Sequence, residues 1–518
     1  MQNNRQAGPA QKTLPPRARA LLMPTLLALA PCVAGAQDGG SGAKRTWSIE
    51  PSVSLRETFT DNQRLQTVKE SDAITEASAG VRVTGTGGAL RGFIDYTLTG
   101  SVYARHNDAN EFRHFLSAAG TAEVIEGQGF VDLRASYTQQ ALSAFGSQST
   151  DPGLSNSNRN DVGSLSISPY LRGRLGGVAR YEARLSVETT RAKGTNASDV
   201  DNGAASLHLD SGDAGSVLGW SADASHTVAD YRAGRHTFDS RARATVTYLI
   251  SRELRVGLTG GTERTDIVTL NGESNATWGA QLEWTPSERT SLSANAEKRF
   301  FGTAHSLRFA HRTPNTVWTL SDSRDISTNS SQGNASFGSA YDLFFRQFAS
   351  AEPDAVKRDV LVRNYLQTNG INPNATVIGG FLASAATLQR TQSLSVALVG
   401  VRNTVTLQAS ASHSERADKV TTALDDLSNV RDVRQRGVSI DWAHRLTAQS
   451  SLGVAASYQR SDSDSSAQQT TLKAITATWT STLGPKSTLT AGARHAVFDS
   501  TSAPYDENAL YAAFRLSF

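Results

Sequence analysis

The feature that most constrains this 518-residue chain is an alternation of apolar and polar residues with a period of two, repeated along its length. Such alternation marks β-strands with one apolar and one polar face. Between Tyr181 and Val187, for example, apolar residues alternate with Glu, Arg and Ser. The segments span roughly 9–13 residues, longer than ordinary globular strands and suited to a tilted strand that crosses a bilayer. The pattern predicts an all-β fold, a transmembrane antiparallel up-and-down β-barrel of about 22 strands (20–24).

The composition agrees with this prediction and disfavours a set of soluble domains. Hydrophobic residues make up 38% of the chain. Outside the N-terminus, no stretch approaches the roughly 20 consecutive apolar residues of a membrane-spanning helix. The apolar residues are spread in alternation, as expected for strands that face lipid on one side only.

The N-terminus is typical of a secretory signal peptide, predicted over residues 1–36. A basic stretch without acids precedes an apolar core from Ala20 to Ala30, and Ala34-Gly35-Ala36 supplies a small-residue cleavage site. We expect the mature chain to begin at Gln37, with a linker over 37–45 and the barrel over 46–518. An exported barrel of this type is expected in the outer membrane of a Gram-negative bacterium.

Removal of that leader changes the charge balance. The precursor has 51 Lys+Arg and 48 Asp+Glu. The leader contains four basic residues, so 51 − 4 leaves 47 basic against 48 acidic residues, a net charge of −1. The mature chain therefore gives no electrostatic reason to expect a nucleic-acid partner.

The predicted connections between strands alternate in length. Short turns fall near Gly87-Gly88, Gly176-Gly177 and Gly484-Pro485-Lys486, with longer polar loops between such turns, for example near 57–72 and 140–161. Outer-membrane barrels have short periplasmic turns and longer outside loops, so this alternation favours a barrel over a solvated sandwich.

The C-terminus carries a predicted assembly signal. Phe514, Leu516 and Phe518 alternate with polar or small residues, and the chain ends on an aromatic. This ending resembles the terminal strand that outer-membrane barrels present to the barrel assembly machinery. We therefore expect that machinery and outer-membrane lipid as partners.

One segment, residues 325–390, interrupts the strand pattern. Glu352-Pro353-Asp354 suits the start of a helix, and Gly370 suits its end. The segment is long for a bare loop. Two alternatives remain open: a partly helical plug that narrows the lumen, or a surface loop that contains a helix.

The inward face of the predicted barrel is rich in arginine. The candidate lumen-lining residues are Arg172, Arg174, Arg180, Arg184, Arg241 and Arg243. Arginine forms bidentate pairs with carboxylates, so these residues could brace the wall. They could equally form a charged path for an anionic polymer.

No motif for catalysis or cofactor binding stands out. The sequence contains no HExxH, no phosphate-binding loop, no GxSxG elbow and no dinucleotide fingerprint. We expect no enzyme activity, no catalytic residue, no cofactor and no metal site.

The first strands also resemble a known family. Trp47-Ser48-Ile49-Glu50-Pro51-Ser52-Val53 and Glu57-Thr58-Phe59-Thr60-Asp61-Asn62 are similar to the start of an uncharacterised outer-membrane β-barrel family associated with the PEP-CTERM/exosortase system and exopolysaccharide gene clusters. The resemblance implies a channel or export component for exopolysaccharide or another envelope polymer, with polysaccharide export components as possible partners. The alternatives are a closed structural or adhesive scaffold and, less favoured by the motifs, a barrel enzyme.

Overall fold

The computed structural model describes residues 47–85, 87–194, 199–212, 216–329, 331–333, 341, 344–345, 358–359, 361–363, 366, 380–417, 425–464 and 468–518. The predicted signal peptide and linker lie outside these residues. The barrel unit spans Thr46–Phe518.

Twenty-two strands form one closed antiparallel sheet, and two short strands pair separately. The barrel strands are β1 (Trp47–Thr60), β2 (Asp72–Gly85), β3 (Leu90–Tyr103), β4 (Glu111–Ile125), β5 (Gly129–Ala141), β6 (Arg159–Leu175), β7 (Ala179–Ala192), β8 (Val200–Asp210), β9 (Leu218–Tyr231), β10 (His236–Leu249), β11 (Leu254–Thr265), β12 (Glu273–Ser287), β13 (Thr290–Arg299), β14 (Gly302–Arg312), β15 (Thr316–Ser327), β18 (Thr387–Val399), β19 (Asn403–Arg416), β20 (Asp432–Arg445), β21 (Ser450–Ser463), β22 (Gln469–Gly484), β23 (Ser487–Ser500) and β24 (Tyr505–Ser517).

The remaining elements lie in the connections. The short pair is β16 (Ser331–Gly333) and β17 (Gly380–Leu382), and the short helices include η1 (Asn107–Ala109) and α3 (Asp426–Asn429). Among the described residues, no helix is long and apolar enough to cross a membrane.

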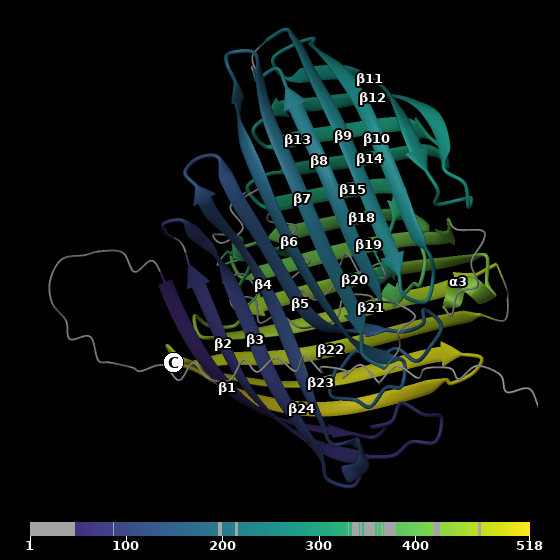
Figure 1. The fold of residues 1–518 in the computed structure, drawn as a ribbon. Helices are drawn as coiled ribbons and strands as arrows, with labels where there is room; N and C mark the ends of the chain where they lie inside the picture. Colours follow the sequence, from purple (N-terminus) through teal and green to yellow (C-terminus); the bar gives the residue numbers. More distant parts are fainter. Residues whose placement is uncertain are drawn as a thin grey trace, which may run out of the picture. The chain divides into compact units, whose positions relative to one another are not determined.

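The first and last strands close the barrel. β1 pairs antiparallel with β24, from Ser52 opposite Ser517 to Thr60 opposite Ala509. Figure 1 shows these strands side by side, β1 in purple and β24 in yellow. Because every barrel strand has two neighbours, the sheet has no free edge, which is the condition for placing strands in lipid. The predicted fold class is confirmed.

Most connections alternate in length as predicted; the exceptions are 300–301, which is short at the long-loop end, and 211–217, which is longer at the other end. At one end, β4 and β5 are joined through 126–128, and β22 and β23 through 485–486. At the other end lie the longer connections 61–71, 142–158, 328–386 and 417–431. By the rule for outer-membrane barrels, this long-loop end faces outward from the cell. The insertion leaves from that end.

The face that each strand residue presents follows from the register, because paired residues in a sheet point to the same side. Arg56 and Glu76 are paired across β1 and β2, and both contact groups inside the barrel. Their parity therefore defines the lumenal face, and the opposite parity faces lipid. Leu185 and Val246 have the outward parity and are exposed, which fits a lipid-facing apolar band.

This polarity reverses at the long-loop end. Arg191 and Asp201 point outward there and form an ion pair of 2.7 Å. Their chain neighbours Ala192 and Val200 point inward and are buried. Charged groups outside and apolar groups inside are the arrangement of a water-soluble protein. We infer that the rim stands above the hydrocarbon. The arrangement with apolar residues toward lipid and charged residues toward the lumen therefore holds only for the part of the wall between the rim and the short-turn end.

Candidate functional site: the closed outer end of the lumen

An apolar layer fills the inside of the barrel at the long-loop end. One part of it centres on Leu154, from the β5–β6 loop, which is buried with side chains of the surrounding wall. That cluster contains Leu65, Ile74, Tyr103, Leu154, Leu472, Phe498 and Tyr505. Its wall members come from β2, β3, β22, β23 and β24, so the loop packs across this side of the lumen.

Residues 380–386 extend the layer to the opposite side. Leu382 is buried against Val162 and Ala192 of β6 and β7. The adjacent Phe381 packs in a different cluster, with residues of the β19–β20 connection and β20 such as Val433. Because neighbouring residues reach β7 on one side and β20 on the other, this segment crosses the lumen.

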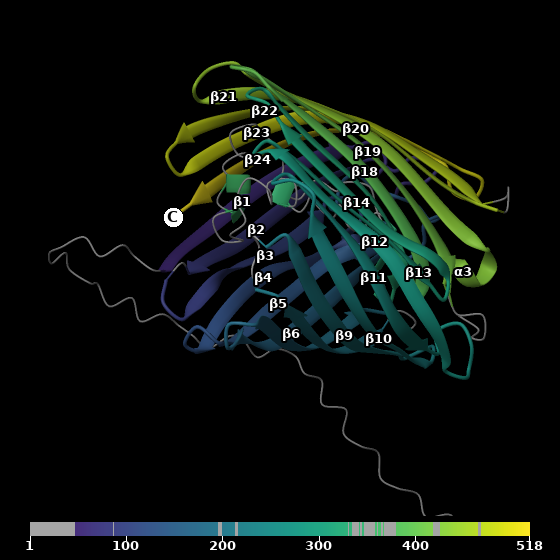
Figure 2. The same cartoon turned by 90° about the horizontal axis from the view of Figure 1, so that it is seen from above.

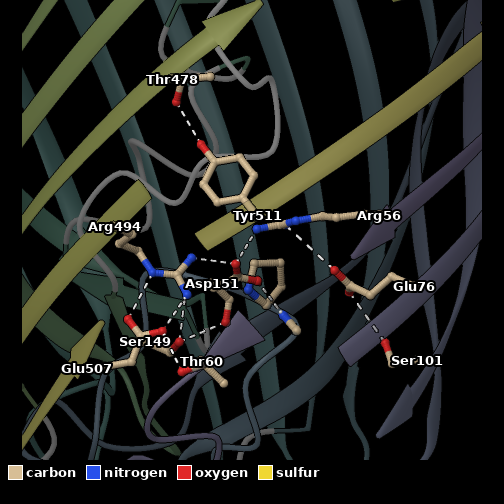
Figure 3. Close-up of polar contacts among 12 residues, drawn as sticks. Arg56, Thr60, Glu76, Ser101, Ser149, Asp151, Thr478, Arg494, Glu507 and Tyr511 are labelled. Atoms are coloured by element: carbon tan, nitrogen blue, oxygen red, sulfur yellow. Dashed lines mark hydrogen bonds and ion pairs between the residues drawn. The ribbon is translucent and has the colours of Figure 1, made fainter. Parts of the chain in front are cut away.

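The β5–β6 loop, residues 142–158, is also held by a buried carboxylate. Asp151 lies between Arg56 of β1 and Arg494 of β23, and its Oδ2 is 2.5 Å from Arg56 Nη2 (Figure 3). Its Oδ1 accepts the backbone N–H of Gly153 at 2.8 Å. Burial alone would raise the pKa of Asp151, but Arg56, Arg494 and the Gly153 N–H hold it well below its usual range. The loop is therefore anchored by an ionised carboxylate.

Further side chains contact the two arginines that bind Asp151. Arg494 binds Glu507 of β24 through Nη2 at 2.8 Å and Nε at 3.0 Å. Thr60 donates its hydroxyl to the same carboxylate at 3.0 Å (Figure 3). The Arg56 guanidinium also lies 4.7 Å from the centre of the Tyr511 ring. Side chains from β1 and β23, the strands on either side of β24, thus bind the same loop residue, Asp151.

Backbone contacts fix the loop at other points. The Tyr103 hydroxyl donates to the Gly153 carbonyl at 2.7 Å, and the Tyr505 hydroxyl donates to the Gln148 carbonyl. Ser143 donates its hydroxyl to Asp426 of α3 at 2.8 Å. The loop therefore folds into the lumen. The sequence predicted a long polar loop here and did not predict its inward course.

The described residues of the insertion also contact the lumenal wall. Asp359 forms an ion pair with Arg82 of β2, and Arg363 forms one with Asp95 of β3. Phe345 lies against Phe93, with ring centres 6.4 Å apart. Figure 2 shows short helical pieces of this segment within the ring of strands. These contacts favour a lumenal segment over a surface loop. The predicted helix start at 352–354 and end at Gly370 lie outside the described residues.

The arginines singled out from the sequence lie on the lumenal face, and most have partners. Arg184 contacts Asp132 at 2.8 Å and Glu182 at 3.2 Å. Arg180 contacts Asp210 at 2.9 Å. The guanidinium of Arg172 lies 4.3 Å from the centre of the Phe130 ring. Arg174 is paired in the sheet with Arg180 and is exposed.

Arg241 and Arg243 belong to a second group of lumenal charges. Arg243 lies 3.3 Å from Asp223 and 3.4 Å from Glu297, and Arg241 lies 3.9 Å from Glu297. Close by, Arg299 of β13 is almost wholly buried and binds Glu263, Asp239 and Asp325. This arrangement supports the bracing interpretation of the arginines, while their role in solute passage stays a prediction.

The lumenal wall of β18–β22 is different in kind. Among its inward positions, all within the described residues, only Arg416, Asp441 and Arg445 at the end of β20 are ionisable. The others are mainly Ser, Thr, Gln and small residues. We call β18–β22 the uncharged wall, and β1–β15 the charged wall. The inward arginines predicted from the sequence, from Arg172 to Arg243, all lie on the charged wall.

The C-terminal residues lie where a terminal strand requires them. Phe514 and Phe518 are exposed on the outside of the barrel, and Leu516 shares their parity. The backbone N–H of Phe518 donates to the Pro51 carbonyl of β1 at 2.9 Å. Their role as an assembly signal stays a prediction.

The apolar layer has a signal in the sequence that was not among the predictions above. Inward positions change from polar to apolar in the last residues before the long-loop end. In β2 the inward residues change from Glu76 to Ile74, and in β8 they change from Asn202 to Val200. Repeated over several strands, this switch marks where the lumen is filled.

Within the described residues, no group of three or more His, Cys, Asp or Glu side chains could hold a metal ion. The expectation that the chain is not an enzyme stays a prediction.

No protein-family model matches the chain, and no curated protein matches it either. Solved structures do. One is the FrpB iron transporter from Neisseria meningitidis, with 10% identity, 92% of this chain and 83% of that chain covered, and a TM-score of 0.48. A second is the siderophore receptor PirA from Pseudomonas aeruginosa, with 9% identity, 91% and 80% covered, and a TM-score of 0.43.

A third is a mutant of the ferric enterobactin receptor PfeA from Pseudomonas aeruginosa. Its identity is 11%, with 93% of this chain and 81% of that chain covered and a TM-score of 0.44. Likeness at this level does not transfer a ligand. The resemblance to the PEP-CTERM-associated family stays a prediction, since no family model matches.

The expected function is corrected by these findings. An exopolysaccharide export component is wrong for this chain. The named neighbours are an iron transporter and siderophore receptors. The two alternatives, a closed scaffold and a barrel enzyme, are no better supported. The physical reason lies at the outer end, because an extruded polymer needs a continuous polar path and the apolar layer interrupts it. The chain is a 22-stranded barrel of the outer-membrane type.

Proposed function

We propose that this barrel takes up a small solute across the outer membrane, through a lumen that is closed at the outer end until its inner segments move. The observation that carries the proposal is the anchoring of residues 142–158 inside the barrel by Asp151, between Arg56 and Arg494. The anchored loop packs with the wall in the apolar layer at this end, and a polymer exporter would be obstructed by it.

The direction of the proposal rests on where the closure lies. The apolar layer is at the long-loop end, which meets the outside of the cell. A solute arriving from outside therefore meets the closure first. Its binding energy could shift the equilibrium between closed and open arrangements, provided that it binds the open arrangement more tightly.

The experiment compares solute entry into vesicles that contain the purified barrel. The wild type should be nearly impermeable to small sugars and ions. Asp151→Asn removes the anchoring charge and leaves two arginines facing each other, so permeability should rise at least about tenfold, corresponding to about 1.4 kcal/mol in the closed–open equilibrium.

The matched control is Asp108→Asn. Asp108 lies in η1 at the same end of the barrel and contacts Arg64, but its side chain is 71% exposed. This variant should remain as tight as the wild type. Ferric siderophores, the class named for the similar structures, are the first solutes to test for uptake by cells that carry or lack the chain. A wild type that is already freely permeable would contradict the proposal.

A further inference from the structure

The outer face of β20, β21 and β22 carries three basic residues at one level of the membrane. Arg436 is paired with Arg460 in the register, and Lys473 is paired with the exposed Tyr458, all with outward parity. Nine, ten and eleven strand residues, respectively, separate the three cations from the short-turn end. A membrane-spanning strand needs about 9–11 residues, and aromatic residues mark the membrane interface. The three cations therefore lie where the hydrocarbon ends on the outer side.

The carboxylates that contact these cations lie farther from the hydrocarbon. Arg460 Nε is 3.2 Å from Asp462, which is two residues closer to the rim. Lys473 Nζ is 3.1 Å from Asp499, which is opposite Thr471 and so also closer to the rim. Both acids leave the side of the cations that faces the membrane open to another anion.

Arg436 adds an unmatched charge to this face. It is exposed and, among the described residues, has no hydrogen bond or ion pair. The next outward arginine, Arg434, is neutralised by Asp432 at 2.5 Å. Like charges directly opposite each other on neighbouring strands are destabilising, as Arg436 and Arg460 are here. An anion between the two guanidiniums would remove that repulsion, and arginine binds phosphate through two parallel hydrogen bonds.

A groove lies on the outer face beside these cations. It has a volume of 660 Å³ and spans β22, β23, β24 and the end of β1. Ala477 and Ala493 are paired at its centre, and Ile475 and Leu510 stand beside them as larger side chains. Ile475 is the next outward residue below Lys473 on β22. The groove therefore continues from the basic level into the hydrocarbon, as an acyl chain does below its headgroup.

Other strands do not share this combination. At the corresponding distance from the short-turn end, the outward residue is Glu57 on β1 and Asp201 on β8. β11 has a cation at this level, Arg264, but its partners in the register are Ser240 and Ser274. A pair of opposed cations beside a groove is thus a particular feature of β20–β24, strands that Figure 1 shows side by side.

We propose that the outer face of β20–β24 binds a phosphorylated glycolipid of the outer leaflet, with its phosphates on Arg436, Arg460 and Lys473 and an acyl chain in the groove. Basic clusters at membrane surfaces recognise anionic lipid headgroups. The inference concerns the outside of the barrel and does not rest on the proposed uptake function.

The spacing of the cations favours a headgroup with more than one phosphate. Arg436 and Lys473 lie on strands two apart, which places their backbones about 10 Å from each other. One phosphate can bridge the opposed arginines of β20 and β21, while a second is needed to reach Lys473 as well. A glycolipid with a phosphate at each end of a disaccharide meets this requirement, and a phospholipid with a single phosphate does not.

The first experiment counts bound lipid by native mass spectrometry. The purified barrel is titrated in nonionic detergent with diphosphoryl lipid A, and at least one molecule should remain bound to the wild type. Changing Arg436 and Arg460 together to Gln should weaken this binding about tenfold or more. Removing both phosphates from the lipid should have a similar effect. Filling the groove with Ala477→Phe and Ala493→Phe should also weaken binding, although every cation remains.

Thermal unfolding in the same detergent separates lipid binding from a structural role of the arginines. Without lipid A, the double Gln variant should be at least as stable as the wild type, because the repulsion between Arg436 and Arg460 is removed. With lipid A, the wild type should gain stability and the variant should gain less. A variant that is less stable without lipid would show that the arginines brace the wall, and the inference would be overturned.

The matched control changes Arg191 and Arg264 together to Gln. It removes the same charge from outward positions on β7 and β11, and it should bind lipid A as the wild type does. Equal weakening in this control would overturn the inference. So would equally tight binding of phosphatidylglycerol, or equal stabilisation by inorganic phosphate alone. Neither measurement involves passage through the lumen, so failure of the uptake proposal leaves this result unchanged.

Discussion

The charged and uncharged walls use polar residues in two ways. On β1–β15, arginines are matched with carboxylates from neighbouring strands, as Arg184 is with Asp132 and Glu182. On β18–β22, inward hydroxyls and amides replace those pairs, and several remain unpaired. A lumen rich in charge is therefore not in itself a path for ions. Where the charges bind one another, they hold neighbouring strands of the wall together.

The largest difference between the walls should appear in stability. Arg299→Met leaves Glu263, Asp239 and Asp325 close together without their shared cation, in a site where Arg299 and Glu263 are 2% and 0% exposed. Removing one member of a buried ionic group typically costs about 3–5 kcal/mol. We expect a loss of that size in the free energy of unfolding, measured by guanidinium titration of the barrel folded in vesicles.

Two controls make this comparison specific. Gln408→Met on the uncharged wall should cost about 1 kcal/mol or less, since no partner is stranded. Arg174→Met should change stability by no more than about 0.5 kcal/mol because that side chain is exposed. Equal losses for Arg299→Met and Gln408→Met would mean that the two walls do not differ energetically.

The outer face should not distinguish the walls, because both meet lipid. Leu185→Arg on β7 and Ile440→Arg on β20 should each destabilise the barrel by about 2–4 kcal/mol if they lie near the bilayer midplane. Both side chains are exposed on the outside. The inward neighbours Ser186→Glu and Ser439→Glu are the paired controls.

The lumenal controls add a second test to the same experiment. Ser186→Glu should be tolerated, since the charged wall has cations nearby such as Arg184. Ser439→Glu should cost more, because the uncharged wall offers no matched cation among its described neighbours. The measurement is again the unfolding free energy in vesicles, and equal losses at both serines would mean that the two walls accept a lumenal carboxylate equally well.

Acidification should affect loop anchors on the two sides in opposite directions. The pKa of Asp151 is depressed, so its contribution to stability is present above its ordinary pKa and is lost only as the pH falls through the lower folded value. Burial raises the pKa of Asp426, so its contribution is present at low pH and is lost as the pH rises through the folded value.

Lowering the pH from about 7 to about 5 should therefore leave the Asp151 anchor intact and not reduce the stability contributed by Asp426. We expect vesicle permeability to stay low over this range. Asp426→Asn should remove any gain in stability on acidification, as seen by thermal unfolding at the two pH values. A barrel that opens at pH 5 would show that another group controls the closure.

Much of the fold could be predicted from the sequence, because the lipid face imposes a strict period of two. Segments such as Tyr181–Val187 show that period directly, and Phe514, Leu516 and Phe518 show it in the strand that pairs with β1. The alternation of short turns and long loops was visible for the same reason, since turn residues interrupt the apolar pattern.

The closed outer end could not be predicted in the same way. The inward fold of residues 142–158 depends on Asp151 meeting Arg56 and Arg494, which lie 95 and 343 residues away in the chain. No local pattern encodes such a contact. The uncharged wall could have been recognised from the Ser- and Gln-rich inward positions of β19, but that needed a register that only strand pairing supplies.

The smallest effect expected concerns ion selectivity. Arg172, Arg174, Arg180 and Arg184 face the lumen on either side of the Gly176-Gly177 turn, yet three of the four are engaged by acids or by an aromatic ring. In a wet lumen the residual field is screened over about 8–10 Å. Changing Arg172, Arg174 and Arg184 together to Gln, in the Asp151→Asn background that conducts, should therefore shift the reversal potential under a salt gradient only slightly toward cations. The shift should grow at low salt.

The matched triple change of Thr476, Thr478 and Thr480 to Val on the uncharged wall should produce no shift. A large shift from the arginine variant would mean that their charges are not neutralised by their neighbours, and the charged wall would then be an ion path as well as a brace.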